Sequence, residues 1–241
     1  MSETIRARLG FVTLGPASGP HFSSMQLLVP PDVRWDPEVL GLYGKTHEDI
    51  RGIHEVIVNR VRPLAQQHQW QGVTLAAAMV EIMNPGIRER LQDALKVPVT
   101  TALDSVIPAL RAFKARRIAL ITPMDEAANG PIREHLRSVG IEAYSPASVI
   151  KNYLDAGNLG PDDVYAIAEK ALKQVPPVDA VYFQAAILDP IRVLDRMERH
   201  LGVPVVASLP AMLWRILSKL GLRYKISGYG RLLKEWPKAP E

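Results

Sequence analysis

The 241-residue sequence contains no cysteine. This absence excludes disulfide bridges, thiolate metal sites and cysteine nucleophiles together, and it favours a cytoplasmic chain. Long hydrophobic runs are also missing, because no stretch approaches the roughly 20 apolar residues that a membrane-spanning helix requires. The early charges Glu3, Arg6 and Arg8 are not followed by an apolar stretch of the signal-peptide type. We therefore expect a cytoplasmic protein that makes no contact with a membrane.

Aromatic residues are scarce, at 6% of the chain, and the net charge is only +4. Basic residues gather in residues 111–117 and again in residues 215–238. Such clusters can bind nucleic acid, but neither is interleaved with the aromatic side chains that stack on bases. We interpret both clusters as solvated surfaces and expect no nucleic-acid partner.

Short apolar runs alternate with amphipathic segments through most of the chain. The predicted strands are residues 8–14, 73–80, 97–99, 118–122, 141–144, 181–183 and 203–207. The predicted helices are a segment that opens at Thr46 and residues 84–95, 102–113, 131–139, 161–175, 190–201 and 210–220. A loop rich in glycine, proline and serine is expected up to Pro31. Short buried strands separated by helices are typical of parallel sheets covered on both faces, so an α/β fold is predicted.

Two stretches of the sequence are repeated in the same order. Residues 8–13 (RLGFVT) are echoed by residues 117–122 (RIALIT). Residues 75–99, which contain LAAAM, NP and VPV, are echoed by residues 184–205, which contain QAAI, DP and VPV. Two ordered matches indicate an internal duplication.

The duplication predicts two α/β lobes with parallel sheets, related by approximate two-fold symmetry and separated by a cleft. We place the first lobe in residues 1–109 together with residues 211–241, and the second lobe in residues 110–210. The C-terminal helix is expected to return to the first lobe. A homo-oligomer is compatible with the sequence.

Three predicted strands are followed by a capping residue and a proline that lead into a helix, at Asn84-Pro85, Asn129-Gly130-Pro131 and Asp189-Pro190. Ligands of open parallel sheets bind beyond the carboxyl ends of the strands, and helix N-termini favour anions. Capping alone explains any single one of these loops. Three of them around one cleft favour a small carboxylate or phosphate ligand.

Several familiar sites are missing from the sequence. No dinucleotide fingerprint, P-loop or Gly-x-Ser-x-Gly motif is present. The histidines do not show a spacing that would hold a metal ion. We therefore expect neither a metal nor an organic cofactor.

The ordered motifs of the chain carry a family resemblance. They are residues 97–101 (VPVTT), 109–120 (ALRAFKARRIAL), Asn129, 198–206 (ERHLGVPVV), 210–214 (PAMLW) and 228–232 (GYGRL). With these motifs the chain resembles the aspartate/glutamate racemase superfamily, in its arylmalonate decarboxylase and maleate isomerase branch. The resemblance implies two Rossmann-like lobes and cofactor-independent chemistry on small carboxylic acids in the cleft between them.

The resemblance also locates the missing thiols. Racemases and isomerases of the superfamily use one cysteine from each lobe, and the decarboxylase keeps only the second. The two positions fall at Ala77 and Ala185 of this chain. A thiolate removes an α-proton or attacks an alkene carbon, and alanine can do neither.

Other pocket positions of the family have changed as well. The threonine–serine pair that donates hydrogen bonds to the substrate carboxylate is replaced by Ala78 and Met79, and the pocket tyrosine is replaced by Met124. The small glycines after the second thiol are replaced by Ala186 and Ile187. The mechanism of the family therefore does not transfer directly to this chain.

Two carboxylates and one amide are candidates for catalytic groups. Glu81 follows Ala77 by four residues, and Asp189 follows Ala185 by four. Desolvation would raise the pKa of either acid and suit it to general acid–base work. Gln184 could orient a ligand by hydrogen bonds. The alternatives are that Asp189 only caps its helix and that Glu81 is a solvated loop residue. If the repeats are aligned through Asn84-Pro85 and Asp189-Pro190 instead of through the alanines, Glu81 and Asp189 no longer occupy equivalent positions in the two lobes.

Two functions are compatible with these residues. One is an enzyme that acts on a small carboxylic acid with an apolar portion, by chemistry that needs no thiol. The other is a non-catalytic small-molecule binder that keeps the cleft. Substrate contacts are predicted for Thr13, Ala77, Ala78, Met79, Thr122, Met124, Asn129, Ala185 and Ala186.

Overall fold

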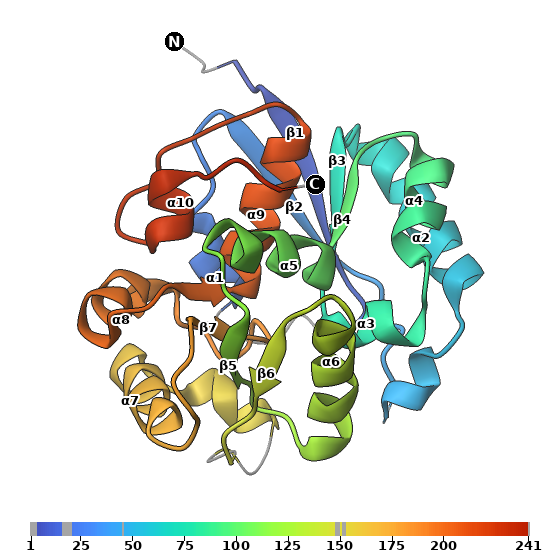
Figure 1. Ribbon diagram of the computed structural model, residues 1–241. Helices are drawn as coiled ribbons and strands as arrows, with labels where there is room; N and C mark the ends of the chain where they lie inside the picture. The colour runs from blue at the N-terminus through green and yellow to red at the C-terminus, as the bar shows by residue number, and fades with distance from the viewer. Residues whose placement is uncertain (1–3, 16–20, 45, 148–149, 151–152, 241) are drawn as a thin grey trace.

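The computed structural model describes residues 4–15, 21–44, 46–147, 150 and 153–240. Two four-stranded parallel sheets organise the chain, with strand orders β2-β1-β3-β4 and β6-β5-β7-β8. The strands are β1 (Ala7–Thr13), β2 (Val33–Val39), β3 (Gly72–Leu75), β4 (Val99–Thr101), β5 (Arg117–Ile121), β6 (Glu142–Tyr144), β7 (Ala180–Phe183) and β8 (Val205–Ala207). The first sheet lies in the upper half of Figure 1 and the second in the lower half. The predicted α/β class with two parallel sheets is confirmed.

Helices connect the strands and cover the sheets. The α-helices are α1 (His21–Gln26), α2 (His54–His68), α3 (Ala78–Met83), α4 (Ile87–Leu95), α5 (Ala102–Ala112), α6 (Glu126–Ser138), α7 (Pro161–Leu172), α8 (Leu194–Leu201), α9 (Ser208–Lys219) and α10 (Arg231–Glu235). Short 3₁₀ helices are η1 (His47–Ile50), η2 (Tyr153–Asn158) and η3 (Ile191–Val193).

The two sheets repeat each other in their backbone hydrogen bonds as well as in strand order. Beyond the end of β3, the Ala76 N–H donates to the Val12 carbonyl at 2.8 Å. At the equivalent place after β7, the Gln184 N–H donates to the Ile121 carbonyl at 3.0 Å. The duplication in the sequence therefore corresponds to the same hydrogen-bond pattern at the carboxyl ends of the central strands in both sheets.

The C-terminal segment packs on the first sheet. Helix α9 contacts β3, β4 and α5 and also β8 of the second sheet, and α10 packs against α9. Trp214 is fully buried in α9, and its indole Nε1 donates to the Pro237 carbonyl at 3.2 Å. These contacts support our proposal that residues 211–241 belong with residues 1–109 and that residues 110–210 form the other lobe.

Strand β2 was not predicted, and α1 lies inside the segment expected to be a loop. Along β2 only alternate side chains near its start are buried, and Asp36, Pro37 and Glu38 follow one another. A proline without an N–H is tolerated at the edge of a sheet, and β2 is an edge strand. The strand signal is weak because one face of β2 meets solvent.

Several predicted boundaries were wrong for related reasons. The strand predicted for residues 73–80 ends at Leu75, and α3 begins at Ala78. A buried apolar run has the same periodicity in a strand and in a short buried helix. The helix predicted from Thr46 is divided into η1 and α2, with Gly52 between them at φ 68°.

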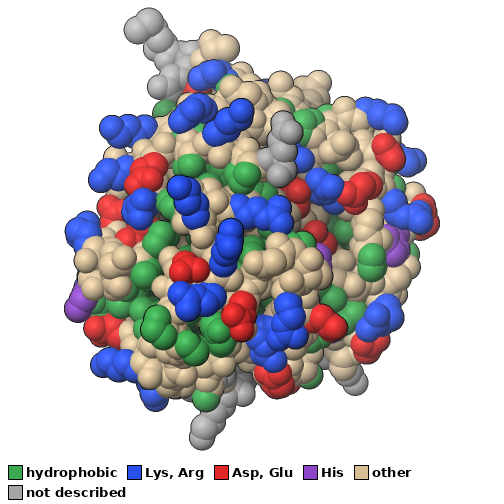
Figure 2. Space-filling view, in the orientation of Figure 1, with side chains coloured by type: hydrophobic (Ala, Val, Ile, Leu, Met, Phe, Trp, Pro, Cys, Tyr) green, Lys and Arg blue, Asp and Glu red, His purple; other side chains and the backbone are tan. Residues whose placement is uncertain are grey.

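Charged side chains of both signs are spread over one face of the molecule. Figure 2 shows Lys and Arg side chains over the whole of this face, with Asp and Glu side chains among them. No helix within the described ranges is long and apolar enough to cross a membrane.

Candidate functional site

A cavity of about 530 Å³ lies where the carboxyl ends of the central strands of both sheets meet. Both halves of the chain contribute to its wall, as the resemblance implied. The lining residues are Phe11, Thr13, Leu14, Gly15, Tyr43, His47, Ala76, Ala77, Met79, Val80, Ala102, Pro123, Met124, Asp125, Ala128, Ile150, Tyr153, Leu154, Gln184, Ala185, Ala186, Ile187, Ser208 and Met212. The wall is mainly apolar, with a few polar groups that could orient a ligand.

The two alanines at the thiol positions begin equivalent turns. After β3, the Val80 N–H donates to the Ala77 carbonyl at 3.1 Å, and after β7 the Leu188 N–H donates to the Ala185 carbonyl at 3.2 Å. Ala77 has φ 74° and Ala185 has φ 78°. A residue with a Cβ atom rarely adopts such backbone, and holding it there costs about 1–3 kcal/mol. The cavity therefore keeps two strained turns although neither carries a reactive side chain.

Replacing Ala77 by glycine is expected to stabilise the protein by about 1 kcal/mol. Glycine adopts positive φ without a Cβ clash, and this gain exceeds the entropy that glycine adds to the unfolded chain. Urea unfolding would measure the change. Ala109→Gly in the buried interior of α5 is the matched control and should destabilise the fold by about 1 kcal/mol or more. A loss of stability in both variants would contradict strain at Ala77.

A histidine–tyrosine pair lines the cavity. The Tyr43 hydroxyl and His47 Nδ1 form a hydrogen bond between the segment after β2 and the start of η1. Burial lowers the pKa of His47, while the charges of Asp125 and Glu48 oppose this shift. The imidazole is therefore neutral at neutral pH and can accept a proton. His47 is a titratable residue of the cavity wall that the sequence analysis did not select, because its spacing to the other histidines gave no signal.

Gln184 lies at the other side of the fold, immediately after β7. The residue lines the cavity, although it is only 2% exposed. The Oε1 atom is buried without a hydrogen-bond partner in the part of the chain that the structure describes. Nearby, the Ser208 hydroxyl donates to the Phe183 carbonyl at 3.3 Å and also lines the cavity.

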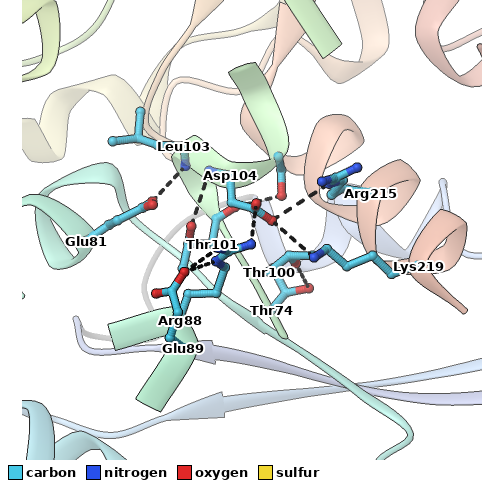
Figure 3. Close-up of polar contacts among 11 residues, drawn as sticks. Thr74, Glu81, Arg88, Glu89, Thr100, Thr101, Leu103, Asp104, Arg215 and Lys219 are labelled. Atoms are coloured by element: carbon cyan, nitrogen blue, oxygen red, sulfur yellow. Dashed lines mark hydrogen bonds and ion pairs between the residues drawn. The ribbon is translucent and has the colours of Figure 1, made fainter. Parts of the chain in front are cut away.

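Glu81 does not line the cavity. Its carboxylate turns toward the start of α5, where it accepts the Leu103 N–H at 3.1 Å (Figure 3). A hydrogen bond with the Thr101 side chain also favours the charged form of Glu81. Burial raises the pKa of Glu81 to about 7, and these two hydrogen bonds only partly oppose the shift. Glu81 is therefore not a solvated loop residue, and its side chain does not form part of the cavity wall. It accepts one of the free N–H groups of a helix N-terminus, that of Leu103.

An ionic cluster beside Glu81 joins three helices. Asp104 of α5 meets Arg88 of α4 at 2.9 Å, and Arg215 and Lys219 of α9 approach it at 3.8 Å and 4.0 Å (Figure 3). Asp104 is mostly buried. The cluster connects α4 and α9 to the helix that Glu81 caps.

Asp189 also lies outside the cavity wall. Its Oδ1 accepts the Ile191 N–H at 3.0 Å, which is the capping role considered as the alternative. Because this carboxylate is directed to its own turn, the structure does not bring Asp189 to the ligand space.

Thr122 and Asn129 are held by each other instead of facing the main cavity. The Thr122 hydroxyl donates to Asn129 Oδ1 at 2.7 Å, and Asn129 Nδ2 donates to the Met124 carbonyl at 3.0 Å. Helix α6 begins at Glu126, capped by Asp125, so Asn129 and Pro131 lie inside the helix and not in a loop before it. The structure therefore does not place Thr122 and Asn129 in the wall of the main cavity, because their polar groups form hydrogen bonds with each other and with the nearby Met124 carbonyl.

Ala78 is fully buried in α3 and also lies outside the cavity wall. The other predicted contacts do line it, namely Thr13, Ala77, Met79, Met124, Ala185 and Ala186, and so does the catalytic candidate Gln184. In the described part of the chain, no cluster of three His, Asp or Glu side chains is arranged to hold a metal ion.

Known proteins share this sequence pattern and this architecture. The sequence model of the arylmalonate decarboxylase family matches residues 10–233. Arylmalonate decarboxylase of Bordetella bronchiseptica is 26% identical over 211 residues, which cover 85% of this chain and 88% of that protein. Maleate isomerase of Geobacillus stearothermophilus is 26% identical over 170 residues, covering 65% and 67%.

Solved structures agree with these sequence matches. A mutant of arylmalonate decarboxylase in its sulfate-associated form is similar with a TM-score of 0.82 at 26% identity, covering 94% of this chain and 99% of the other. The maleate isomerase Iso from Pseudomonas putida shares the fold with a TM-score of 0.81 at 20% identity, covering 95% and 99%.

Proposed function

Because the chain belongs to the arylmalonate decarboxylase family, we propose that it is a cofactor-independent enzyme that uses acid–base chemistry in place of a thiol. Its substrate is a small carboxylic acid, or an uncharged derivative of one, with an apolar portion. The observation that carries the proposal is the His47 imidazole in the cavity wall, hydrogen-bonded to the Tyr43 hydroxyl.

The His47 pair can hold a proton at a defined atom. In the neutral ring, a proton on Nδ1 donates to the Tyr43 oxygen and leaves Nε2 free as the base. Nε2 takes a proton from the carbon next to the substrate carbonyl, and the imidazolium returns it. Asp125 faces His47 with a charge that stabilises the imidazolium formed in this step.

The apolar wall supports this step in two ways. It accepts the apolar portion of the substrate, and it excludes water from the reacting carbon. Gln184 and Ser208 supply hydrogen-bonding groups for the carbonyl end of the substrate.

Hydrogen–deuterium exchange at the α-carbon tests the proposal. A panel of α-aryl and α-alkyl acids and their amides is incubated with the protein in D₂O and followed by proton NMR. Exchange that depends on the protein supports the enzyme. Binding of panel members without exchange, turnover or decarboxylation would reject it in favour of a binding protein.

The binding protein is the second candidate function. The observation that favours it is the alanine at each thiol position, Ala77 and Ala185, within an otherwise retained cavity. Under this function the affinity for a ligand would not change when His47 is replaced by a neutral residue.

Ala185→Cys is expected to leave arylmalonate decarboxylation undetectable. The restored thiol would stand in the second lobe, but Ala78 and Met79 cannot donate the side-chain hydrogen bonds that the family uses for the carboxylate. Carbon dioxide release from phenylmalonate measures the outcome, with the unmodified protein as the control. Clear decarboxylation by the variant would show that the thiol alone was missing.

A further inference from the structure

The side chain of Gln184 is a polar group placed in the wall of an apolar cavity. It follows β7 directly, and its backbone N–H is fixed by the Ile121 carbonyl at 3.0 Å. Gly, Ala and other small residues could occupy such a turn, but this position carries an amide. Around it the wall is formed by Ala185, Ala186 and Ile187.

The amide of Gln184 is unsatisfied in the described part of the chain. Its Oε1 is buried and has no hydrogen-bond donor there, and the residue is 98% covered. A buried acceptor without a donor destabilises the folded protein, so such groups are rare outside functional sites. A ligand donor that enters the cavity would supply the missing partner.

The missing donor restricts the chemistry of the ligand. A carboxylate carries only acceptors, so it can pair with the Gln184 NH₂ group but leaves Oε1 unpaired. A carboxamide carries an N–H and a carbonyl side by side and can satisfy both ends of the glutamine amide. Among the described lining residues none is Lys or Arg, and Asp125 adds a negative charge, which further disfavours an anion.

We infer that Gln184 is a specificity-determining residue that binds a carboxamide group through two hydrogen bonds, so that the ligand class is a small apolar carboxamide. The ligand N–H donates to Oε1, and the ligand carbonyl accepts from Nε2. The inference rests on the cavity of the proposed function and narrows its substrate to the uncharged derivative. The apolar portion of the ligand then lies against side chains such as Met79, Met124 and Ile187.

Phenylacetamide and phenylacetate form the matched pair of probes, since they differ only in the amide and the carboxylate. Isothermal titration calorimetry of the full chain at neutral pH measures both affinities. The amide is expected to bind at least about tenfold more tightly than the acid. Gln184→Met should weaken binding of the amide about tenfold and weaken binding of the acid less, because the acid loses only the hydrogen bond from the Gln184 NH₂ group.

The unliganded variant supplies an independent readout. Because methionine has a similar length and no unpaired polar atom, Gln184→Met should raise the melting temperature by about 2–4 °C. Gln174→Met, at an exposed position, is the matched control and should change neither the melting temperature nor the affinities. If Gln184→Met fails to fold, Gln184→Glu serves instead and should lose the preference for the amide.

Three results would overturn the inference: equal affinities of the two probes, an unchanged amide affinity in both Gln184 variants, or no binding of either probe. Failure of the proposed function is a different result. Selective binding of the amide without exchange at the α-carbon would support this inference and reject the proposed enzymatic function. If the protein exchanges the α-hydrogen of free acids and Gln184→Met does not change that rate, the proposed enzyme stands and the carboxamide inference is rejected.

Discussion

Replacement of His47 by asparagine is expected to lower α-carbon exchange by about 100-fold or more, which is the contribution of a positioned general base. Asparagine places a hydrogen-bonding atom near the former Nδ1, so Tyr43 keeps a partner and the loop keeps its shape. The variant lacks the ring nitrogen that takes the proton. Initial rates by proton NMR in D₂O measure the effect, and the loss should appear in kcat with little change in KM.

The pH profile identifies the group that is lost. Because burial lowers the pKa of His47 below its usual 6.5, the base form persists below that pH. The acidic limb of the exchange rate should therefore lie below pH 6.5. Asp125→Asn keeps the N-cap of α6, since asparagine caps as well as aspartate, but removes a charge that raises the pKa of His47. The limb should move to still lower pH in this variant.

His68→Asn is the matched control for the histidine substitution. His68 pairs with Glu38 at 3.2 Å, away from the cavity wall, and its loss should leave the exchange rate unchanged. An equal fall in both variants, or no fall in His47→Asn, would remove His47 from the mechanism.

Glu81→Gln is expected to stabilise the protein by about 3 kcal/mol at pH 8 and to have little effect at pH 4. The glutamine oxygen can still accept the Leu103 N–H, so the start of α5 keeps its cap. What the substitution removes is a buried charge. Denaturant unfolding at a series of pH values measures the difference between the two proteins.

The direction follows from the raised pKa of this acid. In the folded protein the pKa of Glu81 is about 7, while its ordinary value is 4.5. Below pH 4.5 both states carry the proton, and the stability of the native protein is not reduced. Between pH 4.5 and 7 the unfolded chain has released a proton that the folded protein keeps, so stability falls by about 1.4 kcal/mol per pH unit. Above pH 7 the full loss is present, and glutamine avoids it.

An exposed acid supplies the comparison. Glu55→Gln, on the solvent face of α2, should change stability only slightly and without this pH dependence. Parallel pH curves for native protein and Glu81→Gln would show that the carboxyl is not desolvated in solution.

The sequence predicted the scaffold of the site better than its chemistry. The repeated strands and the family motifs selected Ala77 and Ala185, which both line the cavity, because strand ends and turns follow from local patterns. His47 was missed because its approach to Tyr43 depends on the path of the chain between β2 and α2. That path follows the edge strand β2, whose apolar signal is weak.

The polar candidates show that a list of polar side chains chosen from the sequence does not predict which of them will line the cavity. Gln184 was predicted and lines the cavity. Thr122 and Asn129 were predicted equally from the sequence, but they satisfy each other. Glu81 was predicted to be near the strand ends, but its carboxylate turns to a helix N-terminus. Which polar group remains unpaired is decided by neighbours that are distant in sequence.

The two strained turns give the protein a practical property. Ala77 and Ala185 face the cavity from rigid backbone, and the whole chain contains no cysteine. A cysteine introduced at either position would be the sole thiol of the molecule, so a thiol-reactive fluorophore or spin label would attach there and nowhere else. Each lobe thus has a position at which an optical or magnetic reporter can follow ligand entry without background labelling.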